Sequence, residues 1–195
     1  MSHIHRFEPG TASRRPLLLL HGTGGNEDDL LALGRMVAPG AALLSPRGKV
    51  LENGMPRFFR RLAEGVFDFA DVQHRAQELA DFVIAAGNQY QIERPIALGY
   101  SNGANIAAAL LLLRPEILAG AVLLRAMVPL PQQPETGSTE APVLIISGRR
   151  DPIVLLENAT QLAEMLRAAA CAGPPGSKLL SSVTQASTSA SSNGE

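Results

Sequence analysis

Short, almost continuously apolar runs recur along the chain, and longer segments with helical periodicity separate them. Runs of this length indicate strands buried on both faces of a sheet. They are Pro16–Leu20, Ala41–Leu44, Ile96–Tyr100, Gly120–Leu124 and Val143–Ser147, with an edge strand expected at His3–Phe7. The helical patterns are Glu27–Val37, Val72–Ala86, Asn102–Leu113 and Glu157–Ala170. Strands that alternate with helices of this size predict an α/β fold, in which helices cover both faces of a mostly parallel sheet.

Composition narrows the class of protein further. A chain of 195 residues with 46% hydrophobic and 18% charged residues suits one globular domain. The net charge of −1 gives no electrostatic case for binding nucleic acid or an anionic membrane. The longest apolar run, Ile106–Leu113, is too short to span a bilayer, and the first residues lack the apolar core of a signal peptide. We therefore expect a cytoplasmic protein without integral membrane association.

The C-terminal part of the chain breaks the alternating pattern. Residues 171–195 are rich in Ser, Thr, Gly and Ala and show almost no apolar periodicity, so we expect a disordered tail after an α/β core at residues 1–170. The single cysteine, Cys171, cannot form an internal disulfide. Pro129–Pro142 is interpreted as a Pro-rich surface loop.

The stretch GYSNG, Gly99 to Gly103, has the pattern of a nucleophile mount. A serine hydroxyl reacts as a nucleophile only when a base removes its proton and N–H donors stabilise the oxyanion. G-x-S-x-G between a strand and a helix lifts its serine above the sheet on a sharp turn. Because a predicted strand precedes Ser101 and a predicted helix follows it, we interpret Ser101 as a nucleophile, although an ordinary Gly-Ser turn has the same pattern. The Asn102 N–H then lies at a helix N-terminus, where an anion is favoured.

A second candidate stretch, LLLLHGTGGNEDDL, closes an apolar strand with a Gly-rich loop. In hydrolases with such an elbow, a loop after an earlier strand gives the second oxyanion donor, and we take the Thr23 N–H as that donor. A dinucleotide-binding loop is excluded, because Glu27 stands where G-x-G-x-x-G needs a glycine and the acidic residues after it would repel a pyrophosphate. His21, on the oxyanion side, is interpreted as a structural loop residue.

An acid follows a late strand in APVLIISGRRDPIV. Asp151 stands where the triad carboxylate belongs in the order Ser, Asp, His. The other interpretation is a turn or a helix N-cap, which Asp followed by Pro also suits. With Ser101 upstream, we favour the triad acid.

Taken together, these stretches resemble the phospholipase/carboxylesterase family. The resemblance runs from about Pro16 to Arg167 and includes LLSPRGKVLENGMPRFFRR and LLRAMVP as well as the stretches above. It implies an α/β-hydrolase three-layer sandwich that cleaves carboxylic esters, thioesters or lysophospholipid-type esters of small molecules through an acyl-enzyme, without metal or cofactor. It implies Ser101 as nucleophile, Asp151 as triad acid, and the Thr23 and Asn102 amides as the oxyanion hole. Family members often form dimers, so a homodimer is the assembly that the resemblance suggests.

SPRGKVLENGMPRFFRR is where we expect substrate contacts, because it follows a strand end at the active-site edge of the sheet. Phe58 and Phe59 are candidates for lining an acyl or aryl pocket, and Arg47 for meeting an anionic group. The alternative for each is an ordinary role, with the phenylalanines in the core and the arginine in solvent.

The family's histidine is missing from its expected place. The four histidines are His3, His5, His21 and His74, and all of them precede Ser101. Three explanations stay open: a shifted reading frame or truncated gene model, a naturally inactive relative that uses the fold for binding, or an unusual triad based on His74 or His21. The resemblance also implies that the last strand, the histidine loop and the final helix are missing or replaced. A missing strand would leave Val143–Ser147 as an unprotected apolar edge, so we expect this chain to be nearly inactive and poorly soluble.

Overall fold

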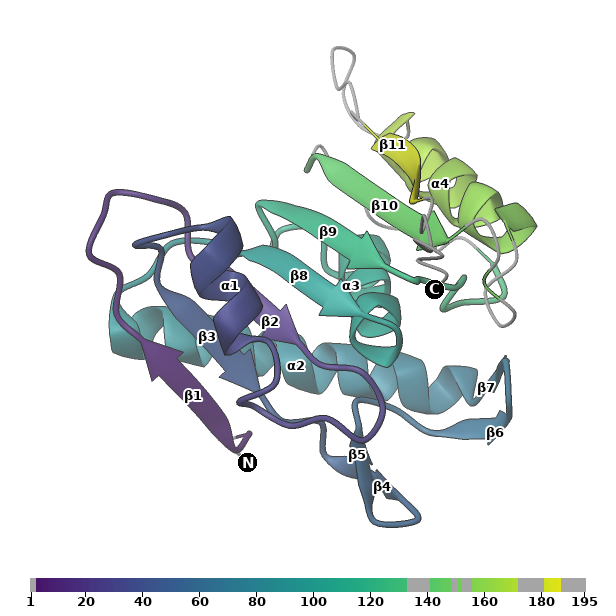
Figure 1. Ribbon diagram of the computed structural model, residues 1–195. Coiled ribbons are helices and arrows are strands. Elements are labelled where there is room, and N and C mark those ends of the chain that lie inside the picture. The colour runs from purple at the N-terminus through teal and green to yellow at the C-terminus, as the bar shows by residue number, and fades with distance from the viewer. Residues whose placement is uncertain (1–2, 133–140, 149–150, 152–155, 172–180, 187–195) are drawn as a thin grey trace, which may run out of the picture.

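The computed structural model describes residues 3–132, 141–148, 151, 156–171 and 181–186. Within these residues, seven strands form one sheet in the order β1-β3-β2-β8-β9-β10-β11 (Figure 1). The strand β1 is antiparallel to β3, and every other neighbouring pair in the sheet is parallel. The strands of this sheet are β1 (His5–Glu8), β2 (Leu17–Leu20), β3 (Leu43–Pro46), β8 (Ile96–Tyr100), β9 (Gly120–Leu124), β10 (Val143–Gly148) and β11 (Ser181–Ala186).

Helices lie on both faces of this sheet, as the alternating pattern predicts. They are α1 (Leu31–Val37), α2 (Phe69–Tyr90), α3 (Asn102–Leu113) and α4 (Leu156–Cys171). In β2, Leu18 and Leu20 join the core that α2, α3 and α4 share, whereas Leu17 and Leu19 join a smaller core under α1. Side chains alternate between the faces of a strand, so the run of four leucines is buried on both sides. The α/β-hydrolase three-layer arrangement is thereby confirmed.

Two helices begin at other residues than the apolar periodicity predicts, because polar side chains bond to the backbone near their N-termini. The helix α1 begins at Leu31 rather than at Glu27, because the side chain of Asn26 accepts the Asp28 N–H and stabilises a turn there. The helix α2 begins earlier than predicted, since Asp68 caps it and accepts the Asp71 N–H at 3.2 Å.

Two short hairpins follow β3, and the first lies in the segment where the sequence predicts substrate contacts. They are β4 (Val50–Glu52) with β5 (Met55–Arg57), and β6 (Arg61–Ala63) with β7 (Val66–Phe67). In Figure 1, β4 and β5 lie below the sheet, and β6 and β7 lie beside one end of α2. Positive φ values at Asn53 and at Gly54 fit an Asn-Gly hairpin turn.

One sequence-based expectation is wrong: the last strand is present. Ser181–Ala186 forms β11 and pairs in parallel with all of β10, from Val143↔Ser181 to Gly148↔Ala186. Parallel pairing uses backbone N–H and C=O groups, so a segment with little apolar periodicity can still form an edge strand. The strand β10 is therefore not the open edge that we expected, and residues 181–186 of the predicted disordered tail belong to the sheet. Most of the predicted surface loop, residues 133–140, lies outside the described part of the chain.

Candidate active site

Ser101 occupies a strained turn between β8 and α3. Its backbone has φ 51° and ψ −113°, which is uncommon for a residue with a Cβ. The turn depends on its flanking glycines. A Cβ at Gly103 would lie 2.0 Å from the carbonyl oxygen of Leu20, and one at Gly99 would lie 2.7 Å from the Cα of Ala104. Glycines at both positions therefore allow α3 to start directly against β2, as the G-x-S-x-G pattern predicts.

The two predicted oxyanion donors come from the ends of neighbouring strands. Thr23 follows β2 and is exposed, while Asn102 is the first residue of α3 after β8. The Asn102 N–H has no preceding intrahelical acceptor, because it belongs to the first turn of the helix. The loop that holds Thr23 is tied to the first hairpin, since the Gly24 N–H donates to the carbonyl oxygen of Pro56 at 3.0 Å.

The side chain of Asn102 has a role that the sequence did not indicate. It is buried, and its Oδ1 accepts the Phe58 N–H at 2.7 Å. Asn105, one turn later, accepts the Met127 N–H at 2.7 Å. These two amides connect the first turns of α3 to loops that come from other parts of the chain.

His21 is buried between two loops and has both ring nitrogens engaged. Nδ1 lies 2.6 Å from the carbonyl oxygen of Gly22, and Nε2 accepts the Gly48 N–H at 2.9 Å. Burial lowers the pKa of His21, which favours the neutral ring that this bonding requires. The prediction that His21 is a structural loop residue is confirmed, and no ring nitrogen is left for Ser101.

The other three histidines have partners other than Ser101. His3 packs on the ring of Phe82, and His5 lies between the carbonyl oxygen of His3 and the hydroxyl of Tyr90. His74 is exposed on α2, with Nε2 3.8 Å from the carboxylate of Glu78. Among the described residues, no hydrogen bond joins any of the four histidines of the chain to Ser101.

Asp151 is paired with a residue that the sequence analysis overlooked. Its carboxylate is 6% exposed and receives two N–H groups of Arg125, Nε on Oδ2 and Nη2 on Oδ1 at 2.7 Å. The Arg125 Nη1 also donates to the hydroxyl of Tyr100, the residue before Ser101, at 3.0 Å. These contacts raise the pKa of Arg125, with the Asp151 bond the larger cause. The sequence did contain a signal for this residue, because Arg125 is a charged residue directly after an apolar run, in LLRAMVP.

The three predicted substrate contacts have structural partners of their own. Arg47 makes a two-point ion pair with the buried Glu27, with Nη2 and Oε1 2.7 Å apart, and this bond lowers the pKa of Glu27. Phe58 packs on the ring of His21, with ring centroids 4.8 Å apart, and Phe59 is fully buried against Phe67. The structure thus gives both phenylalanines a packing role, and their contact with substrate stays a prediction.

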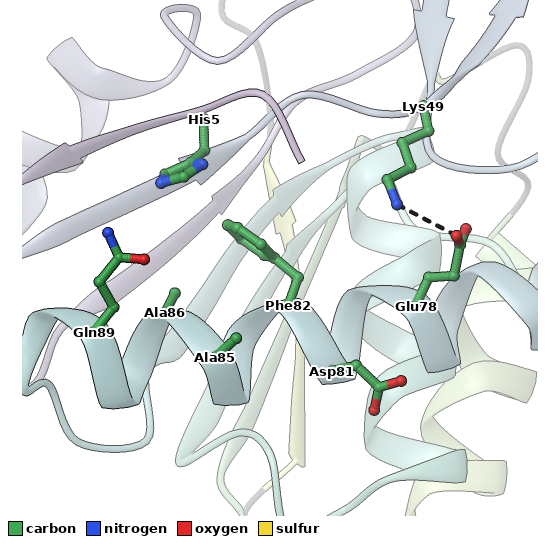
Figure 2. A pocket seen from close by; sticks show the side chains of 8 residues that line it. All are labelled: His5, Lys49, Glu78, Asp81, Phe82, Ala85, Ala86 and Gln89. Carbon is green, nitrogen blue, oxygen red and sulfur yellow. Dashed lines mark hydrogen bonds and ion pairs between the residues drawn. The ribbon is translucent and has the colours of Figure 1, made fainter. Parts of the chain in front are cut away.

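A cavity of about 330 Å³ lies between α2 and β1 and contains none of the predicted site residues (Figure 2). Its lining includes His5, Phe82, and the ion pair between Lys49 and Glu78 at 3.3 Å. Ser101 does not line this cavity, and we do not assign it to the candidate active site.

Comparison with known proteins identifies the family and the fold of this chain. The phospholipase/carboxylesterase family matches residues 7–173. MhqD of Bacillus subtilis (strain 168), a protein assigned as a hydrolase, is 52% identical over 169 residues, which are 86% of this chain and 83% of that protein. The crystal structure of a Bacillus cereus carboxylesterase has a TM-score of 0.82 at 44% identity, covering 93% of this chain and 82% of that one. A carboxylesterase from Mesorhizobium loti has a TM-score of 0.78 at 31% identity, covering 89% and 79%. None of the described helices has the length and hydropathy needed to cross a membrane.

Proposed function

The chain belongs to the phospholipase/carboxylesterase family, and from that membership and the geometry at Ser101 we propose that its site is built to hydrolyse carboxylic esters of small molecules through an acyl-enzyme. The observation that carries the proposal is the backbone of Ser101, with φ 51° at the junction of β8 and α3. Strain at a serine between a strand and a helix is a feature of nucleophile turns. Thioesters and lysophospholipid-type esters are substrates of the same reaction class.

The reaction would begin when the Ser101 Oγ attacks the ester carbonyl and the alcohol leaves. The Thr23 and Asn102 N–H groups would stabilise the oxyanion, and Asn102 adds the positive end of the α3 dipole. Water would then release the acid from Ser101. Asp151 would orient a histidine that accepts and returns the proton, and no step needs a metal ion or cofactor.

This 195-residue chain contains no histidine after Asp151, so we propose that it performs the reaction only at a residual rate. Loss of one triad member lowers kcat by on the order of four to six powers of ten, while binding and the oxyanion hole retain some catalysis. The second candidate function is a binding protein on the same scaffold, which the absence of that histidine from the sequence favours.

The test is hydrolysis of p-nitrophenyl acetate by this chain, beside Ser101→Ala, together with labelling by a fluorophosphonate. We expect slow turnover that Ser101→Ala reduces further, and slow labelling at Ser101. Equal rates in both proteins without any labelling would contradict the esterase proposal and favour the binding protein. Fast turnover that depends on Ser101 would contradict the proposed lack of a base.

A further inference from the structure

The neighbouring strands β8 and β9 end at the same level of the sheet, next to Ser101, and β10 continues two residues further, to Gly148. In the parallel register, Tyr100 of β8 is paired with Leu124 of β9, and Leu124 with Ile146 of β10. Ser101 and Arg125 are therefore the first residues beyond β8 and β9, and they lie side by side. The Ser101 N–H donates to the carbonyl oxygen of Leu124 at 2.8 Å, which ties the nucleophile turn to the residue before Arg125.

Arg125 shares the strained backbone of Ser101. Its φ is 56°, and its N–H donates to the carbonyl oxygen of Ile146 at 2.9 Å. The structure describes two other positive-φ residues that are not glycine, Asn53 and Gln91; they lie in a hairpin turn and at a helix C-terminus, where such values are common. Arg125 lies in neither kind of position, so its positive φ has no such local reason. With this backbone, its side chain reaches Tyr100 at the end of β8 and Asp151 beyond β10.

The guanidinium of Arg125 joins the acid to the nucleophile turn. Two of its five N–H groups bind the Asp151 carboxylate, and a third binds the Tyr100 hydroxyl. Because the carboxylate of Asp151 is almost completely buried, it requires a cation nearby to stay ionised. A carboxylate accepts about four hydrogen bonds. Arg125 supplies two of the hydrogen bonds at Asp151, one to each carboxylate oxygen.

We propose that Arg125 is a positioning residue of the active centre, which fixes Asp151 in the place and ionisation state that a triad acid requires. The inference rests on the proposed function, because it gives Asp151 a role in the reaction of Ser101. The rival view is an ion pair that stabilises the fold and does not affect Ser101. The two views differ in one consequence: only a positioning residue affects a proton transfer that depends on Asp151.

The test supplies the missing base as free imidazole and measures phosphonylation of Ser101 by intact-protein mass. In this step the bond from Oγ to phosphorus forms, the phosphorus–fluorine bond breaks, fluoride leaves, and imidazole takes the serine proton. The second-order rate constant in imidazole is compared for the original chain, Arg125→Gln, Arg125→Lys, Asp151→Asn and the double variant Arg125→Gln/Asp151→Asn. The control is Arg15→Gln, because the ion pair of Arg15 with Glu93 is exposed, at 55% and 78%.

We expect Arg125→Gln and Asp151→Asn each to lower the imidazole-dependent rate by on the order of tenfold, and the double variant no further, since coupled residues are not additive. Arg125→Lys should recover only part of the rate, because an ammonium lacks the planar fork with which Arg125 binds both Asp151 oxygens and the Tyr100 hydroxyl. Arg15→Gln should leave the rate unchanged. Melting temperatures of the same set show whether a slow variant is still folded.

The outcomes separate the inference from the proposed function. If imidazole accelerates labelling of the original chain and of a folded Arg125→Gln equally, the positioning role is wrong and the esterase proposal stands. If Arg125→Gln and Asp151→Asn lower the rate additively, the two residues act independently and the inference fails. If imidazole has no effect on labelling of the original chain, Asp151 does not assist Ser101, and the proposed triad fails together with the role of Arg125.

Discussion

Replacing Gly103 by alanine should destabilise the protein, although alanine is the better helix former. A Cβ at this position would lie 2.0 Å from the carbonyl oxygen of Leu20 and 2.5 Å from that of His21. Carbon and oxygen atoms normally approach to about 3.3 Å, so the overlap is on the order of 1 Å. Both obstacles are backbone atoms at the end of β2, and no side chain can rotate away to relieve the contact.

The magnitude follows from two opposing terms. Alanine in place of glycine inside a helix raises the free energy of unfolding by about 1 kcal/mol, because alanine has the higher helix propensity. Overpacking in a core costs about 1 to 3 kcal/mol, and more when backbone must move. Since α3 is buried over almost its whole length, it cannot shift without disturbing the core on every side. We expect a net loss of about 2 kcal/mol or more in the free energy of unfolding.

Gly87 in α2 provides a matched control. A Cβ there would have its nearest contact at 3.4 Å, with the carbonyl oxygen of Ile92, which is an ordinary van der Waals distance. Gly87→Ala therefore gains the propensity term without the clash, and should raise the free energy of unfolding by about 0.5 to 1 kcal/mol.

Urea unfolding followed by circular dichroism measures both variants against the original chain. Opposite signs are the expected result, with Gly103→Ala less stable and Gly87→Ala more stable. A Gly103→Ala protein as stable as the original would refute the close approach of α3 to β2, and with it the geometry of the nucleophile turn. Loss of stability in both variants would instead show that the propensity argument fails for this protein.

Three further predictions concern buried polar groups, and urea unfolding tests each of them. Asn102→Leu should cost about 1 to 3 kcal/mol, because it leaves the buried N–H of Phe58 without its acceptor; an unchanged stability would contradict the anchoring role. Glu52→Gln should cost about 3 kcal/mol, since it removes the charge that is 2.8 Å from the 3%-exposed Arg57, and a loss well under 1 kcal/mol would show that Arg57 is neutralised otherwise. Burial lowers the pKa of His3 from 6.5 to about 4, so the unfolded chain takes up the proton first. The free energy of unfolding therefore has its full value, as far as His3 is concerned, above pH 6.5, and it falls by up to about 3 kcal/mol as the pH falls toward 4. In His3→Gln, the free energy of unfolding should depend less on pH over this range.

Most of the fold could be predicted from the sequence because burial on two faces leaves a clear pattern. The runs at β2, β8, β9 and β10 are almost continuously apolar, and the helix that follows Ser101 is apolar on every side. The strand β11 could not be predicted in this way, because its sequence, SSVTQA, contains no apolar run. The hairpins after β3 were missed for a similar reason, since their strands are only two or three residues long.

The sequence by itself determined the fold class and the place of the strained turn at Ser101, because glycines around a serine between strand and helix specify a local backbone turn. It also determined that no histidine follows Asp151. Only the tertiary structure decided what surrounds Asp151 and His21. It gave Asp151 the guanidinium of Arg125, and it engaged both nitrogens of His21 with Gly22 and Gly48. Such partners come from different strands and loops, and hydrogen bonds between groups far apart in the chain leave no periodic trace in the sequence.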